Sequence, residues 1–462
     1  MLLNNSAYWH YCPIVHTFTL MKETRKLALF DITMIVIGLV IGMGIFRTAK
    51  DAAAASSSPA FYFSVWILGG LIALCGALTY AEIGSRYPVT GGYYKIFAVC
   101  YHPSIAFAIN CVILISNAAS LSGVALIGSE YIAPLLFKNP APFSEAMISI
   151  FAIVSFYGVN LMGLHMSSKT QNVLMVIKIG MILTLIAALF FPALYNSQSQ
   201  TLAPISDSIT TNKFLLFGMA LKAASFSYGG YQQTINFGEE VQNPQRVMPR
   251  GIVIGIFVII ALYLAVNFSY YKIIGFEELK NTRGIAAIVV AKMFGESGRY
   301  VISILLFIAV LAYVNVLLLS NPRVMYAMSL DGILPAAFRR KNEKRDVLTV
   351  SLTVFAAICV IVLFFADKFE QILSFTIFLD SIGMATSAAC IFILRKRTKH
   401  LDNAAIYKMR LYPLMPLIFI IAYVFVGTVI AITNPEYAVT GLSVLTGFII
   451  LYFITHKKRS NL

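Results

Sequence analysis

Charged side chains are scarce in this sequence. Only 12% of its 462 residues are Asp, Glu, Lys or Arg, while 59% are hydrophobic. A soluble globular protein carries about twice that charged share. Water cannot solvate so apolar a surface, which excludes a soluble protein. Apolar runs of about 20 residues, enough to cross about 30 Å of hydrocarbon as helix, recur along the whole chain. The composition therefore predicts an all-α integral membrane protein.

Motifs for catalysis and for nucleotide binding are also absent. The six histidines are scattered, and the six cysteines include no CxxC pair. Neither a GxSxG nucleophile motif nor a GxxxxGK[ST] phosphate-binding loop occurs. We therefore expect no enzyme, no metal or other cofactor, and no direct use of ATP. The net charge of +15 does not indicate nucleic-acid binding, because the basic residues lie in short loops between apolar runs.

The apolar runs predict twelve transmembrane spans. They cover approximately residues 28–50, 60–83, 95–133, 145–164, 168–191, 213–237, 250–273, 299–328, 347–366, 371–394, 411–432 and 436–456. The third run is too long for a simple crossing, so it is either strongly tilted or continues beyond the membrane. About 21 basic residues lie on one side and about nine on the other. This bias predicts a multi-pass protein of the cell (inner or plasma) membrane with both termini in the cytoplasm.

The first twenty residues do not fit the rest of the chain. They have neither a basic start nor a small-residue cleavage site, so they do not form a signal peptide. The segment from Met21, "MKETRKLALF", is typical of a natural start. We therefore expect residues 1–20 to be a non-native or disordered extension. The transporter core is expected at 21–394, and two further spans with a short tail at 395–462.

Two glycine-rich segments interrupt apolar runs at matching places. "IGLVIGMGIF" (37–46) has Gly42 and Gly44 about fifteen residues into the first span, and "SFSYGGYQQ" (225–233) has Gly229 and Gly230 equally far into the sixth. Spans 1–5 and 6–10 then form two repeats of five. Glycine interruptions at corresponding places of two halves are typical of the binding site of a secondary transporter. Close helix packing by small residues is the alternative.

Unwound helix segments have a specific binding chemistry. Their free N–H and C=O groups are tolerated at membrane depth only when buried in protein or facing a wet cavity. The N–H groups that open a half-helix favour a carboxylate, and carbonyls that end a half-helix favour an ammonium. Paired breaks therefore suit the zwitterion that all amino acids share.

Four motifs, in order, carry a resemblance to a known family. They are "IGLVIGMGIF" (37–46), "YAEIGSRYPVTGGYY" (80–94), "FSYGGYQQTINFGEEVQNPQRVMPRGI" (226–252) and "NPRVMYAMSLDGILP" (321–335). From Met21 onward the chain resembles the amino acid–polyamine–organocation (APC) superfamily. The resemblance implies the LeuT-type fold, a 5+5 inverted repeat with broken helices 1 and 6, followed here by two C-terminal helices.

The resemblance also implies the binding residues. The substrate carboxylate would meet the N–H groups of Met43 and Gly44, beside Gly42. Four carbonyls would receive the ammonium, and Phe226 would act as a gate near Gly230. These carbonyls belong to Val40, Phe226, Ser227 and Gly229. Met43 departs from the small residue usual between the glycines, and Tyr231 from the tryptophan usual after the pair, which leaves the side-chain preference open.

Charged residues inside spans are candidates for coupling. In similar sodium-independent members, a lysine at the place of Lys178 stands where sodium-coupled relatives bind sodium, although a snorkelling lysine is the alternative. Asp380 is a proton site or the partner of a lysine or a backbone donor. Two pairs at predicted cytoplasmic helix ends form either ionic gates or solvated charges. These pairs are Glu82 with Arg86 and Glu239 with Glu240.

These observations predict a secondary active transporter of amino acids that works by alternating access. With no acid placed in the expected pocket, the predicted substrates are neutral amino acids. Transport is expected to be sodium-independent, by proton symport or by amino acid exchange. Cationic amino acids or polyamines, and a non-transporting sensor on the same fold, are the alternatives. The expected partners are the small-molecule substrate and the lipid bilayer, with no nucleic acid and no obligate protein partner.

Overall fold

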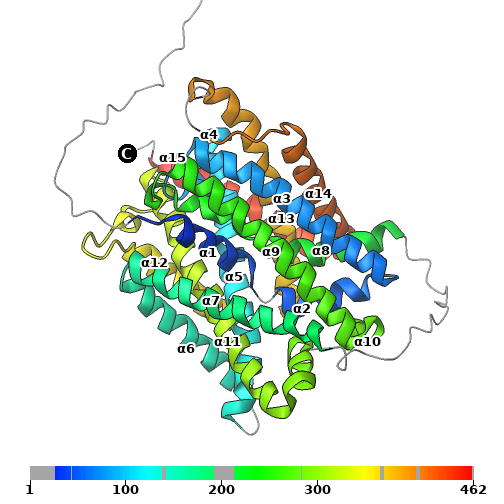
Figure 1. Cartoon of the computed structure of the whole chain (residues 1–462). Helices are drawn as coiled ribbons and strands as arrows, with labels where there is room; N and C mark the ends of the chain where they lie inside the picture. The colour runs from blue at the N-terminus through cyan, green and yellow to red at the C-terminus, as the bar shows by residue number, and fades with distance from the viewer. Residues whose placement is uncertain are drawn as a thin grey trace, which may run out of the picture.

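The computed structural model describes residues 26–42, 44–137, 142–191, 213–281, 284–364, 369–401 and 406–459. Over these residues the chain is helical and forms only isolated β-bridges (Figure 1). Nine of the described helices are long and apolar enough to cross a membrane. The predicted all-helical membrane fold is thus confirmed. The extension predicted at residues 1–20 lies outside the described residues.

The long helices follow most of the predicted spans. They are α3 (Pro59–Arg86), α5 (Pro103–Leu136), α6 (Pro142–Leu161), α7 (Leu164–Ala187), α9 (Pro244–Ile274), α11 (Ile285–Leu330), α13 (Phe369–Arg397), α14 (Leu414–Thr433) and α15 (Pro435–Arg459). Three predicted spans contain only shorter helices. These are 28–50 with α1 (Leu29–Val40) and α2 (Gly44–Ala54), 213–237 with α8 (Lys213–Tyr228), and 347–366 with α12 (Thr349–Leu363).

The long third run is two helices. α4 (Gly92–Cys100) ends before His102, whose extended backbone precedes Pro103 at the first position of α5. Proline fixes its own φ and disfavours helix at the residue before it, so the chain turns here. The continuous span predicted from residue 95 is therefore wrong. Even so, the 34 residues of α5 extend over about 51 Å at 1.5 Å per residue.

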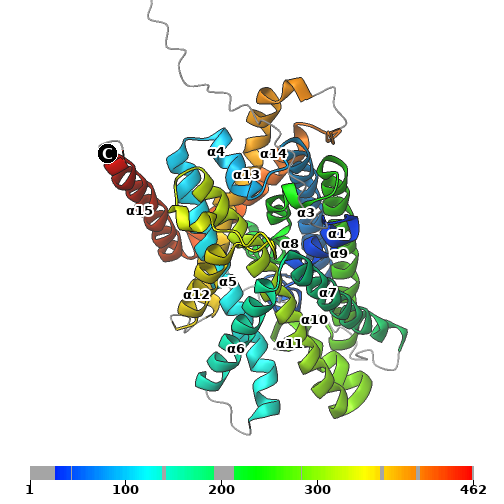
Figure 2. The same cartoon turned by 90° about the vertical axis from the view of Figure 1, so that its left-hand side faces the viewer.

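Helices from the two halves of the chain pack against each other. α3 packs on α9, α5 on α11, α6 on α12 and α2 on α8, while α1 lies against α9 and α7. α14 packs on α13 and α3, whereas α15 lies at the edge of the bundle (Figure 2). Trp66 is fully buried between α3, α8 and α9, with its ring edge-on to those of Tyr228 and Tyr263. This packing brings the two glycine segments together inside the bundle.

Candidate substrate site

The first helix interruption lies directly after α1. Carbonyls there have hydrogen-bond partners other than those of a continuous helix. α1 ends at Val40, and the N–H of Gly42 donates to the Val40 carbonyl at 2.8 Å. The Ile41 carbonyl accepts a hydrogen bond from Nζ of Lys178 in α7. A cation at the carboxyl end of a helix is stabilised by the helix dipole, so Lys178 satisfies the unwound backbone. Met43 lies outside the described residues.

The second interruption separates α8 from the short 3₁₀ helix η3 (Tyr231–Asn236). The N–H of Gly230 donates to Oε1 of Gln232 at 2.9 Å. Gly230 has φ 114°, and a Cβ atom there would lie 2.2 Å from the Leu39 carbonyl oxygen. Only glycine fits this conformation and this distance. The backbones of the two interruptions are therefore in direct contact.

Two hydroxyl groups link the interruptions further. Oη of Tyr263 in α9 lies 3.3 Å from the Val40 carbonyl and 3.1 Å from the Ser227 carbonyl. Oγ1 of Thr48 in α2 lies 2.6 Å from Oγ of Ser227 in α8. A tyrosine hydroxyl has one proton, so it satisfies one of its two carbonyls at a time. The other carbonyl retains a free acceptor position for an ammonium donor.

A cavity of about 60 Å³ lies where the interruptions meet. It is lined by six of the residues predicted for substrate binding: Val40, Gly42, Gly44, Phe226, Gly229 and Gly230. Ser227 lies behind this wall, where a Cβ atom on Gly44 would approach its Cα to 3.1 Å. The structure thus brings together the predicted backbone groups of residues far apart in sequence.

Uncharged polar side chains also line this cavity. Nε2 of Gln233 donates to Oδ1 of Asn117 at 3.0 Å, and Ser120 is hydrogen-bonded to Tyr313 at 2.9 Å. Oε1 of Gln233 is buried and has no hydrogen-bond partner among the described residues. A buried amide oxygen without a donor favours a ligand or a water at this place. Tyr423 of α14 also lines the cavity.

The two residues predicted for coupling occupy different places. Lys178 is fully buried behind α1 and does not line the cavity. Asp380 in α13 lines it and forms no hydrogen bond or ion pair with any described residue. Glu130, another acid within a predicted apolar span, is exposed on α5. The cavity therefore contains a carboxylate, contrary to the expectation of a pocket without an acid.

Several residues of the site were not found from the sequence. Tyr263 is an isolated tyrosine in the long helix α9, and Thr48 lies in α2 just beyond the glycine motif that ends at Phe46. Asn117 and Ser120 follow one another at helical spacing on α5, but their spacing does not indicate which face meets the glycine segments. These side chains become recognisable only when the packing of α5, α9 and α11 is known.

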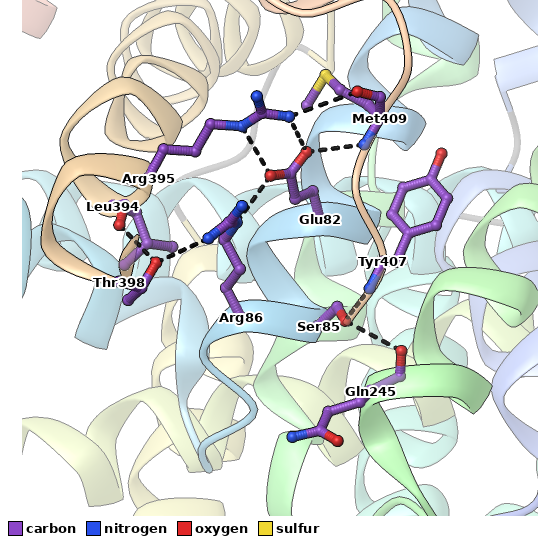
Figure 3. Close-up of polar contacts among 9 residues, drawn as sticks. All are labelled: Glu82, Ser85, Arg86, Gln245, Leu394, Arg395, Thr398, Tyr407 and Met409. Carbon is purple, nitrogen blue, oxygen red and sulfur yellow. Dashed lines mark hydrogen bonds and ion pairs between the residues drawn. The ribbon is translucent and has the colours of Figure 1, made fainter. Parts of the chain in front are cut away.

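A buried ion cluster lies at the end of α3 (Figure 3). Glu82, with no exposed side-chain surface, accepts hydrogen bonds from Arg86 at 2.7 Å and from Arg395 of α13 at 2.6 and 2.8 Å. The N–H of Met409 donates to the same carboxylate at 2.9 Å. Charges this deeply buried are stable only when paired and hydrogen-bonded. Glu82 and Arg86 are therefore not solvated helix-end charges.

A second ion pair fixes the segment before α9. Glu240 lies 2.7 Å from Arg323 of α11, and its carbonyl accepts from the N–H of Leu27 at 2.8 Å. Burial raises the pKa of the Glu240 carboxyl, and the Arg323 guanidinium opposes this rise. The neighbouring Glu239 is exposed and accepts a hydrogen bond from Thr90 at 2.9 Å.

The chain is similar to known amino acid transporters over almost its whole length. A sequence model of the amino acid permease family matches residues 27–455. The serine/threonine exchanger SteT of Bacillus subtilis (strain 168) is 29% identical over 441 residues, covering 94% of this chain and 97% of that protein. Amino acid transporter protein 6 of Caenorhabditis elegans is 25% identical, covering 94% and 83%. The Asc-type amino acid transporter 1 of Mus musculus is 22% identical, covering 93% and 81%.

Proposed function

The chain belongs to the amino acid permease family and is a multi-pass membrane transporter of amino acids, and we propose from this premise that it moves neutral amino acids by alternating access. The main observation that supports this proposal is the cavity at which the two helix interruptions meet. There, the N–H groups that open α2, including Gly44, would bind the substrate carboxylate. The carbonyls around Val40 and Ser227 would bind the ammonium, with the Tyr263 hydroxyl donating to whichever of the two the ammonium leaves free.

The proposed architecture is a 5+5 inverted repeat with broken helices 1 and 6, followed by two C-terminal spans. It is supported by the pairwise packing of helices that would correspond in the two halves, α3 with α9, α5 with α11 and α6 with α12. We propose residues 21–394 as the transporter core and 395–462 as the C-terminal spans and tail. Both termini are proposed to be cytoplasmic in the cell membrane, because basic residues concentrate on that side.

Transport is proposed to be sodium-independent. Nζ of Lys178 donates to the Ile41 carbonyl, so this side chain would occupy the place behind the first interruption that a coupling sodium ion would need. Exchange of one amino acid for another is the favoured mode, because a relative that covers 94% of this chain is named an exchanger. Proton symport is the other mode that the coupling residues Lys178 and Asp380 allow.

Uptake into proteoliposomes tests these modes. An exchanger takes up labelled amino acid only when the vesicles are preloaded with substrate, and a sodium gradient has no effect. Uptake into empty vesicles under an imposed pH gradient would instead establish proton symport. Uptake that requires sodium would contradict the role proposed for Lys178.

A cationic substrate is the second candidate, and Asp380 favours it. A carboxylate that lines the cavity without a described partner attracts an ammonium or guanidinium group of the substrate. Competition of all twenty amino acids against one labelled substrate distinguishes the candidates. Inhibition by small and apolar amino acids supports neutral substrates, whereas inhibition confined to lysine, arginine or a polyamine supports the cationic class.

A further inference from the structure

A second, larger cavity opens between the start of α1 and the first turns of α7. Its volume is about 260 Å³, and it shares no lining residue with the central cavity. Six polar or charged side chains line it: Lys26, Asp31, His165, Ser168, Lys169 and Asn172. No role in amino acid binding is assigned to any of them. The cavity is therefore a candidate for a different ligand.

Some polar atoms of this cavity are already paired, and others are not. Asp31 accepts from Nδ2 of Asn172 at 2.7 Å and from the N–H of Ala28 at 3.0 Å, so both of its oxygens are engaged. Ser168 is 3% exposed, and its Oγ has no hydrogen-bond partner among the described residues. Oδ1 of Asn172 is also unpaired. A buried hydroxyl without a protein partner in a polar cavity favours the binding of a ligand or a water there.

The charge around the cavity is positive. Lys26 and Lys169 are exposed at its rim, and neither forms an ion pair with a described residue. His165 is a third basic group, while Asp31 is the single acid in the lining. α7 begins at Leu164 after Gly163, which provides no side-chain cap. The first N–H groups of this 24-residue helix therefore add a positive end to the cavity.

We propose that this cavity binds a phosphate group. The ammonium groups of Lys26 and Lys169 neutralise its charge, and the Ser168 hydroxyl donates a hydrogen bond to one of its oxygens. Oδ1 of Asn172 accepts from a hydroxyl or a protonated oxygen of the same ligand. Both lysines lie at the ends of apolar spans, on the side that the charge bias predicts to be cytoplasmic. This position admits two sources, the headgroup of an anionic phospholipid and free phosphate. The proposal does not depend on which amino acid is transported.

The test compares the full-length wild type with three variants. Lys169→Gln removes one charge from the rim, and Ser168→Ala removes the unpaired hydroxyl without a change of charge. Lys344→Gln is the matched control, because Lys344 is exposed on the same predicted side but does not line the cavity. Binding of inorganic phosphate is measured in neutral detergent by the shift of the thermal unfolding temperature. Binding of phosphatidylglycerol is measured by its enrichment around the protein in vesicles of phosphatidylcholine and phosphatidylglycerol.

We expect Lys169→Gln and Ser168→Ala each to weaken phosphate binding about tenfold, because each removes one charge-assisted hydrogen bond. Lys344→Gln should bind as the wild type does. An effect in the detergent titration identifies free phosphate as the ligand, and an effect only in vesicles identifies the lipid headgroup. Equal binding by the wild type, both cavity variants and the control in both arms would overturn the proposal. So would a loss in Lys344→Gln as large as that in Lys169→Gln.

Discussion

The central cavity and the end of α3 both bury polar groups inside a membrane protein, but they differ in whether those groups have hydrogen-bond partners. At the end of α3, Glu82 binds Arg86, Arg395 and the Met409 N–H, so its oxygens all have partners. At the central cavity, Oε1 of Gln233 and the Asp380 carboxylate have no hydrogen-bond partner among the described residues. The fully paired cluster stabilises the packing of the helices. The cavity, by contrast, is suited to a ligand that supplies the hydrogen-bond partners its polar groups lack.

This difference predicts which substitutions should destabilise the fold and which should impair transport. Removing one partner from a saturated buried cluster leaves an uncompensated charge and destabilises the fold. Changing the backbone of the cavity leaves the core packing in place but removes the groups that bind the substrate. The predictions below separate these outcomes, starting with the largest effect.

Gly230→Ala should abolish transport while the protein still inserts. A Cβ atom at this positive φ would lie 2.2 Å from the Leu39 carbonyl, so the two interruptions must separate. Gly180→Ala in α7 is the control, because a Cβ atom there meets no atom within 4 Å and Gly180 does not line the cavity. Uptake into preloaded proteoliposomes checks the pair. Equal activity of the two variants would show that contact between the interruptions is not needed.

Glu82→Gln should destabilise the fold by about 3–5 kcal/mol, the cost of breaking a buried ion pair. Arg86 and Arg395 lose their shared counter-charge in this variant. Thermal unfolding in detergent measures the change. The control is Glu277→Gln in α10 (Phe276–Asn281). The Glu277 side chain is 82% exposed, so the loss of its pair with Lys280 should have no measurable effect. A wild-type unfolding temperature in Glu82→Gln would mean that the cluster does not stabilise the fold.

Tyr263→Phe should lower transport about tenfold with little change in stability, since it removes the hydrogen-bond donor to two carbonyls of the site. Tyr270→Phe is a control on the same helix, because Tyr270 is equally buried and its hydroxyl has no partner among the described residues. Initial uptake rates of both variants give the comparison. A similar loss in Tyr270→Phe would point to a general packing effect.

Glu239→Gln should have the smallest effect. Its carboxylate is exposed, and Thr90 is its only hydrogen-bond partner within the described part of the chain, so its loss is expected to cost less than about 1 kcal/mol. Glu240→Gln, one residue on, removes the partner of the buried Arg323 and should lower the unfolding temperature more. Unfolding curves of the two variants, recorded side by side, check this ranking. The reverse ranking would contradict the burial argument.

Much of the fold followed from the sequence because it depends on local signals. Run length predicted the membrane helices, and glycine placement predicted the ends of α1 and α8 near Val40 and Tyr228. The break at Pro103 was missed because the apolar character of the run continues across it. Gly44 and Gly230 were placed by their motifs, whereas Tyr263 and Asp380 depend on tertiary packing. No local pattern states which face of α9 or α13 turns toward the cavity.

Competition by truncated substrates tests the central claim most directly, namely that the paired interruptions recognise the carboxylate and ammonium shared by all amino acids. The best substrate of the twenty-amino-acid panel is compared with its amine, which lacks the carboxylate, and with its acid, which lacks the amino group. We expect only the intact amino acid to compete with labelled substrate. Competition by the amine or the acid at the same concentration as the intact amino acid would contradict recognition by the interrupted backbones.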